Sequence, residues 1–67
     1  MKVLLRNPRR ELEMAAPPDV AALLDGLGIV PESVLVIRND SLVTRDARLD
    51  DADEVEIRPV VSGGARP

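Results

Sequence analysis

The sequence lacks cysteine, histidine, phenylalanine, tyrosine and tryptophan. Without cysteine and histidine it offers no thiolate nucleophile, no disulfide, no imidazole base and no zinc site of the usual ligand types. Without aromatic side chains it has no platform on which the bases of a single-stranded nucleic acid could stack. These absences argue against an independent enzyme, and we predict neither a cofactor nor a metal site.

The sequence also lacks an excess of basic over acidic residues and any long apolar run. Lys and Arg number 9 against 12 Asp and Glu, and this acidic balance argues against a surface that neutralises duplex phosphates. No apolar run approaches the ~20 residues that a membrane-spanning helix needs. The first ten residues carry four basic side chains around three apolar ones, which is unlike a signal peptide. We therefore expect a cytoplasmic monomer with no direct nucleic-acid or membrane partner.

What the chain does contain is aliphatic. Nine Leu, nine Val and three Ile must build the core, with Met14 as a filler. A domain of this size buries only about 60% of its unfolded surface. It can fold alone, with a stability near the low end of the usual ~5–15 kcal/mol.

Five short segments have the composition of strands. Residues 2–6 and 11–14 flank a turn at Pro8 and predict an N-terminal hairpin, with Val3 and Leu5 on one face and Leu4 on the other. The later segments are the apolar run 34–37, a short strand at 41–43 after the Asn39-Asp40 turn, and the alternating run 54–58, which points Val55 and Ile57 inward. Pro59 predicts that the last strand loses its pairing on one side.

One helix is predicted between these two groups of strands. Asp19 follows two prolines and can cap its first turn, and Val20, Leu23, Leu24 and Leu27 form a single apolar stripe. Gly28 stands where a left-handed C-terminal cap is expected. A helix with one apolar face must pack on a sheet. The order β-β-α-β-β-β therefore predicts an α+β β-grasp (ubiquitin-like) fold, with a mixed sheet of four to five strands and one helix on one face. The domain covers residues 1–61, and residues 62–67 form a C-terminal tail.

The chain resembles the small ubiquitin-like sulfur carriers of the ThiS and MoaD type over almost its whole length. The likeness lies in the opening residues 1–3, the helix with Leu27-Gly28-Ile29, the segment LDDADEVEI at 49–57, and Val61-Ser62-Gly63-Gly64. Ala52 replaces the glycine usual in the third of these, which suggests that the turn there avoids a left-handed residue. The stretch 34–64 looks most like the carriers that serve tRNA 2-thiolation, and the carriers for thiamine thiazole and molybdopterin are close competitors.

The resemblance implies a chemistry at the C-terminus. An E1-like adenylyltransferase of the ThiF/MoeB type would adenylate the carboxylate of Gly64, and sulfide would convert it to a thiocarboxylate for a sulfur-accepting synthase or thiolase. Gly63 and Gly64 suit a narrow nucleotide site, because glycine is thin and conformationally free. With no cysteine to hold a persulfide, only the C-terminal carbonyl is left to carry sulfur.

The chain departs from that pattern after Gly64, where Ala65, Arg66 and Pro67 follow. These three residues add about 10 Å and would displace the carboxylate. By analogy with extended family members, we predict cleavage between Gly64 and Ala65 by a JAMM-type zinc metalloprotease.

Partner docking is predicted on the sheet face that the helix leaves open. The strip comprises Leu4 and whichever of Leu35 and Val36 faces away from the helix. Our assignment takes Val36, and the full docking set is Leu4, Val36, Arg58, Val60, Val61 and Ser62. The acidic residues between 50 and 56 form either a solvated face or a docking surface for a basic partner. Two alternative functions stay open: a ubiquitin-like modifier conjugated to lysines, and a non-reactive β-grasp adaptor.

Overall fold

The computed structural model describes residues 1–6 and 9–60 of the chain. In these residues the predicted order of elements is confirmed. The elements are β1 (Lys2–Leu5), β2 (Arg10–Glu13), α1 (Val20–Leu27), a 3-10 turn η1 (Pro31–Ser33), β3 (Val34–Arg38), β4 (Ser41–Val43) and β5 (Glu54–Pro59). The predicted domain boundary at residue 61 and the tail 62–67 lie outside this part of the chain.

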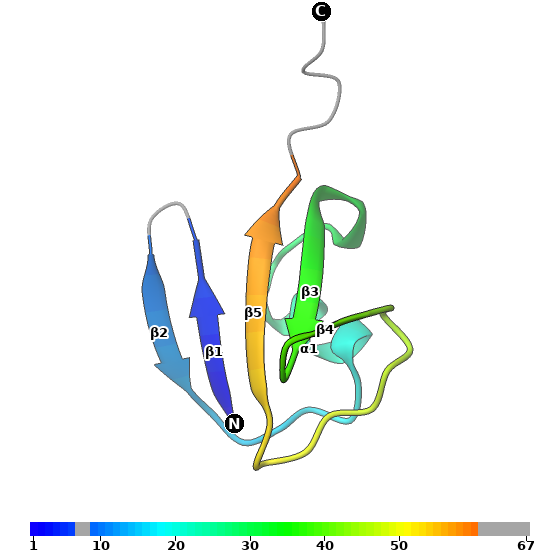
Figure 1. The fold of residues 1–67 in the computed structure, drawn as a ribbon. Helices are drawn as coiled ribbons and strands as arrows, with labels where there is room; N and C mark the ends of the chain where they lie inside the picture. The colour runs from blue at the N-terminus through cyan, green and yellow to red at the C-terminus, as the bar shows by residue number, and fades with distance from the viewer. Residues whose placement is uncertain (7–8, 61–67) are drawn as a thin grey trace, which may run out of the picture.

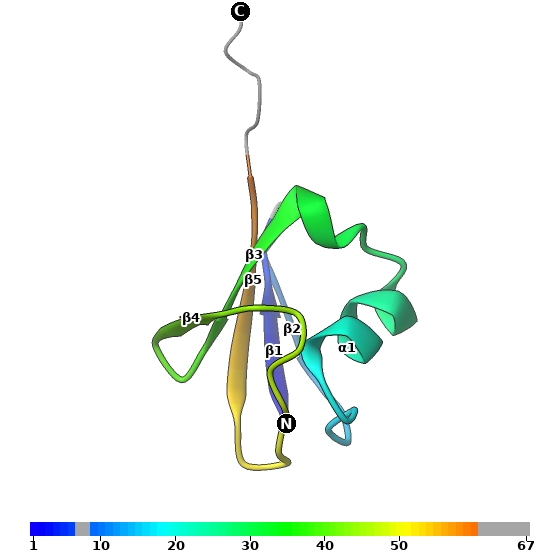
Figure 2. The same ribbon diagram turned by 90° about the vertical axis from the view of Figure 1, so that its right-hand side faces the viewer.

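The strands form one mixed sheet with the order β2-β1-β5-β3-β4. β1 and β5 run parallel at its centre, and the other neighbours are antiparallel (Figure 1). Helix α1 covers one face of the sheet and leaves the opposite face open (Figure 2). The predicted α+β β-grasp fold is confirmed. We call the uncovered side the outer face.

The ends of α1 follow from two residues. The Asp19 side chain accepts a hydrogen bond from the Ala22 amide at 2.8 Å and satisfies a donor that the first turn leaves unpaired. Gly28 ends the helix with φ at 71°, in the left-handed region that glycine adopts without a Cβ clash. Both predicted caps are confirmed.

The core lies between α1 and the inner face of the sheet. Its most buried side chains are Val3 at 0% exposure and Leu24 and Val20 at 1%, and Val55 and Ile57 point inward as predicted. Met1 also belongs to the core, which the sequence pattern did not indicate. Its ammonium group donates to the Met14 carbonyl at 2.7 Å, because pairing of β1 with β2 brings the chain start beside residue 14.

A hydrogen-bonded turn network closes the end of the sheet at which β5 begins. Asn39 and Asp40, which join β3 to β4, adopt φ values of 50° and 72°. The Asn39 side chain donates to Asp53 at 2.9 Å and accepts from the Glu54 amide at 2.9 Å. The β3–β4 hairpin is thereby tied to the start of β5. Ala52 is absent from the residues with positive φ, in line with the expectation for the residue that replaces glycine.

Candidate functional site: the C-terminal strand and the outer face

Strand β5 carries the chain from the middle of the sheet toward the C-terminus. Its pairing with β1 ends at Ile57, whereas its pairing with β3 continues to Pro59. Loss of one partner near Pro59 was predicted from the missing proline donor. The Val60 amide then donates to the Ser33 carbonyl at 2.9 Å, so η1 fixes the last described residue. The predicted activation residues Gly63 and Gly64 and the predicted cleavage partner Ala65 lie outside the described residues.

The outer face holds only part of the predicted docking set. Leu4 lies half-buried on this face opposite Glu56, and Val60 is 38% exposed. Val36 is 5% exposed and belongs to the core, so its assignment to the docking strip is corrected. Side chains alternate across a strand, and Val36 pairs with the inward Ile57, so Leu35 takes the outward position at 46% exposure. The predicted docking residues Val61 and Ser62 are outside the described part of the chain.

Glu56 organises the centre of the outer face. Its side chain is 24% exposed, and one carboxylate oxygen lies 2.9 Å from the Arg6 guanidinium and 3.9 Å from that of Arg58. The Arg6 contact includes a hydrogen bond of 3.0 Å from Nε. Arg58 lies two residues further along β5 on the same face, close to the point where the strand ends. Arg58 belongs to the docking set predicted from the sequence. Its link to Arg6 through Glu56 was not predicted, because the parallel pairing of β1 with β5 creates it.

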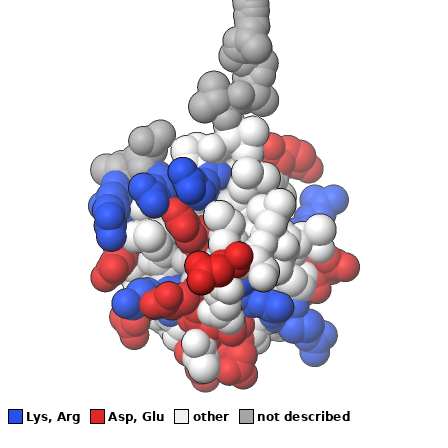
Figure 3. Space-filling view, in the orientation of Figure 1, with Lys and Arg blue, Asp and Glu red and all other residues white. Residues whose placement is uncertain are grey.

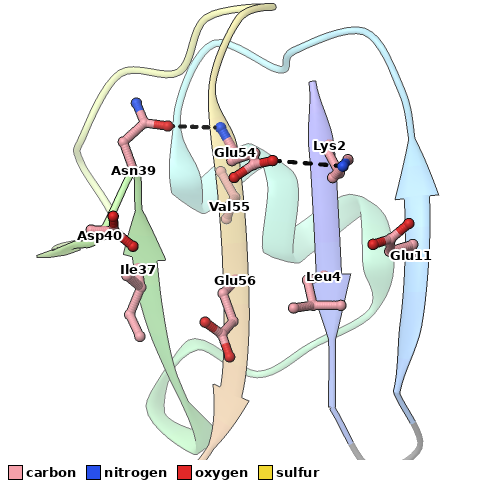
Figure 4. A pocket seen from close by; sticks show the side chains of 9 residues that line it. All are labelled: Lys2, Leu4, Glu11, Ile37, Asn39, Asp40, Glu54, Val55 and Glu56. Carbon is pink, nitrogen blue, oxygen red and sulfur yellow. Dashed lines mark hydrogen bonds and ion pairs between the residues drawn. The ribbon is translucent and has the colours of Figure 1, made fainter.

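Beside Glu56 the outer face is hollowed. A cavity of about 170 Å³ has Leu4 and Ile37 on its walls and is surrounded by charged side chains (Figure 4). Lys2 lies in it with its ammonium 3.6 Å from a Glu54 carboxylate oxygen, and Glu11, Asp40 and Glu56 add three further carboxylates. Figure 3 shows the same face, with uncharged surface running from its middle toward the C-terminal end of β5. The face thus combines an apolar strip and an anionic hollow.

The acidic segment before β5 is largely structural. Asp51 accepts from the Ala16 amide at 2.7 Å, Asp50 accepts from the Ala52 amide at 3.2 Å, and Asp53 accepts from the Asp50 amide at 2.8 Å. The Asn39 amide group, followed by the Asp50 amide, lowers the pKa of Asp53 below its ordinary value, because both bonds favour the charged carboxylate. These bonds connect the segment to β2–α1 and to the β3–β4 turn. These intramolecular hydrogen bonds account for the presence of several carboxylates in the segment, so no docking to a partner protein is needed to explain them.

Two other features are absent from residues 1–6 and 9–60. No three carboxylates converge there in a way that could hold a metal ion. The helix found in this part of the chain is eight residues long, too short to cross a membrane.

Comparison with known protein families matches residues 3–64 to the ThiS family. The chain belongs to the ThiS family. A curated relative, the sulfur carrier protein TtuB of Thermus thermophilus, is 34% identical over 65 residues, which is 96% of this chain and 100% of that protein. The ThiS family match includes Gly63 and Gly64 and leaves out Ala65, Arg66 and Pro67. The resemblance found in the sequence is confirmed.

Proposed function

We propose that this ThiS-family chain is a sulfur carrier protein whose working group is the C-terminal carbonyl of Gly64. The observation that carries the proposal is the family match, which extends through Gly64 and stops there. The relative TtuB, which bears the name of a sulfur carrier protein, is aligned over its whole length. In this proposal the chain is a protein co-substrate and not a catalyst.

The proposed reaction has two steps. An E1-like adenylyltransferase of the ThiF/MoeB type joins the Gly64 carboxylate to AMP from ATP, with pyrophosphate as the leaving group. Sulfide sulfur then attacks the acyl carbon, AMP leaves, and a thiocarboxylate remains for a sulfur-accepting synthase or thiolase. Residues 34–64 most resemble the carriers that serve tRNA 2-thiolation, so we propose that pathway as the destination of the sulfur. The syntheses of thiamine thiazole and molybdopterin are the other two candidates.

The described residues support this proposal through the position of β5. A central strand, bonded to both neighbours over most of its length, ends at Pro59 and gives the chain end a rigid base. From Val60 to Gly64 the chain spans at most about 14 Å. That length lets a thin Gly-Gly end enter a nucleotide site while the folded body stays outside. The proposed docking surface for the activating enzyme lies around the end of β5 and consists of Arg58, Leu35 and Val60.

The residues after Gly64 require a processing step. We propose that a JAMM-type zinc metalloprotease hydrolyses the Gly64–Ala65 bond and exposes the Gly64 carboxylate. Arg66 and Pro67 would otherwise place bulky groups where adenylation needs a bare glycine. The full chain should therefore be inert toward the activating enzyme, and a chain ending at Gly64 should be its substrate.

The test uses both forms with the matching E1-like enzyme, ATP and sulfide, followed by intact-mass measurement. The proposal expects a mass gain equal to one oxygen replaced by one sulfur, on the form ending at Gly64 alone. Failure of that form to release pyrophosphate would favour the non-reactive adaptor. Pyrophosphate release followed by isopeptide bonds to lysines of other proteins, without thiocarboxylate, would favour the modifier.

A further inference from the structure

Lys2 is the only lysine in the chain, against eight arginines. An activated C-terminal acyl group is an electrophile, and an amine is the side-chain nucleophile that would capture it to give a stable amide. The α-ammonium of Met1 is bound to the Met14 carbonyl at 2.7 Å, and the Met1 side chain is part of the core. The Lys2 side chain is 43% exposed and has one ionic partner, Glu54. Lys2 is therefore the accessible amine of the folded body.

The position of Lys2 separates it from the C-terminus of its own chain. Parallel pairing places Lys2 beside Glu54 at the start of β5, and the chain leaves the sheet at the other end of that strand (Figure 1). Six residue steps from Glu54 to Val60 amount to about 20 Å. The four steps from Val60 to Gly64 return at most about 14 Å. Attack within one molecule would therefore need a fully stretched tail pressed over Arg58 and Glu56, and the loss of the Lys2–Glu54 pair.

The tail of a second copy can reach Lys2 without this limit on length. The charges at the two ends of the sheet also favour contact between two copies. Arginines gather where β5 ends, at the tips of β1 and β2 and on β5 itself: Arg6, Arg9, Arg10 and Arg58. The opposite end carries four carboxylates, Glu13, Asp40, Asp53 and Glu54, against two cations, Lys2 and Arg38, and so keeps an acidic excess. The basic end of one molecule is thus complementary to the acidic end of another. This arrangement is head-to-tail.

The hollow around Lys2 also fits the incoming group. It measures about 170 Å³ and is walled by Leu4, Ile37 and the stems of carboxylate side chains (Figure 4). A Gly-Gly end has no side chain to clash with these walls. The same thinness that suits a nucleotide site therefore suits this hollow.

From these observations we infer that Lys2 is an acyl-acceptor site, modified by the activated Gly64 of a second copy and not by its own. The inference rests on the proposed function, which supplies the acyl-adenylate formed from ATP. The unprotonated Lys2 Nζ attacks the Gly64 carbonyl carbon and a C–N bond forms. The bond from that carbon to the AMP phosphate oxygen breaks, AMP leaves with the electron pair, and the new amide nitrogen loses a proton to water. The product is an isopeptide-linked dimer.

The experiment makes the electrophile chemically, so that its outcome does not depend on the activating enzyme. A chain of residues 1–64, which keeps every described residue, is prepared as a C-terminal alkyl thioester by cleavage from an intein. Here the thiol leaves in place of AMP. We expect dimer whose initial rate of formation rises with the square of the protein concentration, with the linkage mapped to Lys2 and Gly64 by peptide fragmentation. Added salt should slow dimer formation more than thioester hydrolysis, because it screens the two charged ends.

Two variants serve as controls. Lys2→Arg keeps the charge beside Glu54 and should reduce dimer formation to background with hydrolysis unchanged. Arg58→Lys places an amine six residues before Gly64 and should give a ring-closed monomer at a rate independent of concentration, which proves the thioester competent. The inference is overturned if Lys2→Arg still forms dimers, if the unaltered chain closes on itself, or if it forms no dimer under conditions where Arg58→Lys closes. Failure of the proposed function would instead appear as an absence of adenylation in the enzymatic assay.

Discussion

At the scale of single residues, the core depends on a few aliphatic side chains. Leu24 is 1% exposed beneath the sheet, whereas Leu42, the same residue type on β4, is 65% exposed. With no aromatic residue to fill space, each methylene of a buried leucine is a large share of the packing.

We predict that Leu24→Ala lowers the free energy of unfolding by about 2–5 kcal/mol, because it removes buried methylenes and leaves a cavity. This is comparable to the whole stability of a small domain, about 5 kcal/mol. Leu42→Ala is the matched control and should change it by less than about 0.5 kcal/mol. Chemical denaturation followed by circular dichroism measures both, since the chain has no fluorescent side chain. Equal losses for the two variants would contradict the described packing.

Two glycines of the helix region make an equally sharp pair. Gly26 lies within α1, and a Cβ there would meet nothing within 4 Å, whereas Gly28 has φ at +71°. We predict that Gly26→Ala raises the free energy of unfolding by about 0.5–1 kcal/mol, through a lower backbone entropy of the unfolded chain. Gly28→Ala should lower it by about 1–2 kcal/mol, because alanine is strained in the left-handed region. Thermal denaturation of both variants measures these changes in stability. A higher stability of Gly28→Ala would be inconsistent with the left-handed cap at Gly28.

At the scale of elements, the turn network that joins β3–β4 to β5 is sensitive to acid. The folded pKa of Asp53 lies below its unfolded value, so the stabilisation it gives is present above the unfolded pKa of about 3.9 and is lost as the pH falls through the folded pKa. The Asn39 side chain is the first cause of that lowering.

We predict that Asn39→Gly moves the pKa of Asp53 up toward its ordinary value, because glycine keeps the positive φ but removes the amide donor. Carboxyl chemical shifts followed by NMR between acid and neutral pH give the value directly. Asp19→Asn serves as a control elsewhere in the fold, because its amide oxygen can still cap α1. An unchanged Asp53 pKa in Asn39→Gly would mean that the Asn39–Asp53 bond does not form in solution.

The elements themselves followed from the sequence because their signals are local. Period-2 alternation marked β2 and β5, while Asp19 and Gly28 marked both ends of α1. The errors concern non-local relations. An unbroken apolar run such as 34–37 does not reveal which face is buried, and only its pairing with β5 showed that Val36 points inward and Leu35 outward. The Arg6–Glu56 pair and the acidic turn network likewise arise from residues distant in sequence.

At the scale of the whole molecule, the residues of the uncovered outer face can contact a partner, whereas the residues beneath the sheet stabilise the fold. Leu35 and Val36 are adjacent in β3, yet one is exposed and the other lies in the core. We predict that Leu35→Ser leaves the unfolding midpoint nearly unchanged but weakens activation by the E1-like enzyme, read as a raised KM with kcat preserved. Val36→Ser should instead unfold at lower denaturant, because it buries an unpartnered hydroxyl. A KM for Leu35→Ser equal to that of the unaltered protein would remove Leu35 from the docking surface.

The proposed active form of the protein ends at Gly64 and carries sulfur on its terminal carbonyl. The most direct measurement is the intact mass of the protein purified from its own cells under thiol-preserving conditions. We predict a chain lacking Ala65, Arg66 and Pro67, accompanied by a second species heavier by the difference between sulfur and oxygen. A population that retains all 67 residues, with no sulfur-bearing species, would contradict it.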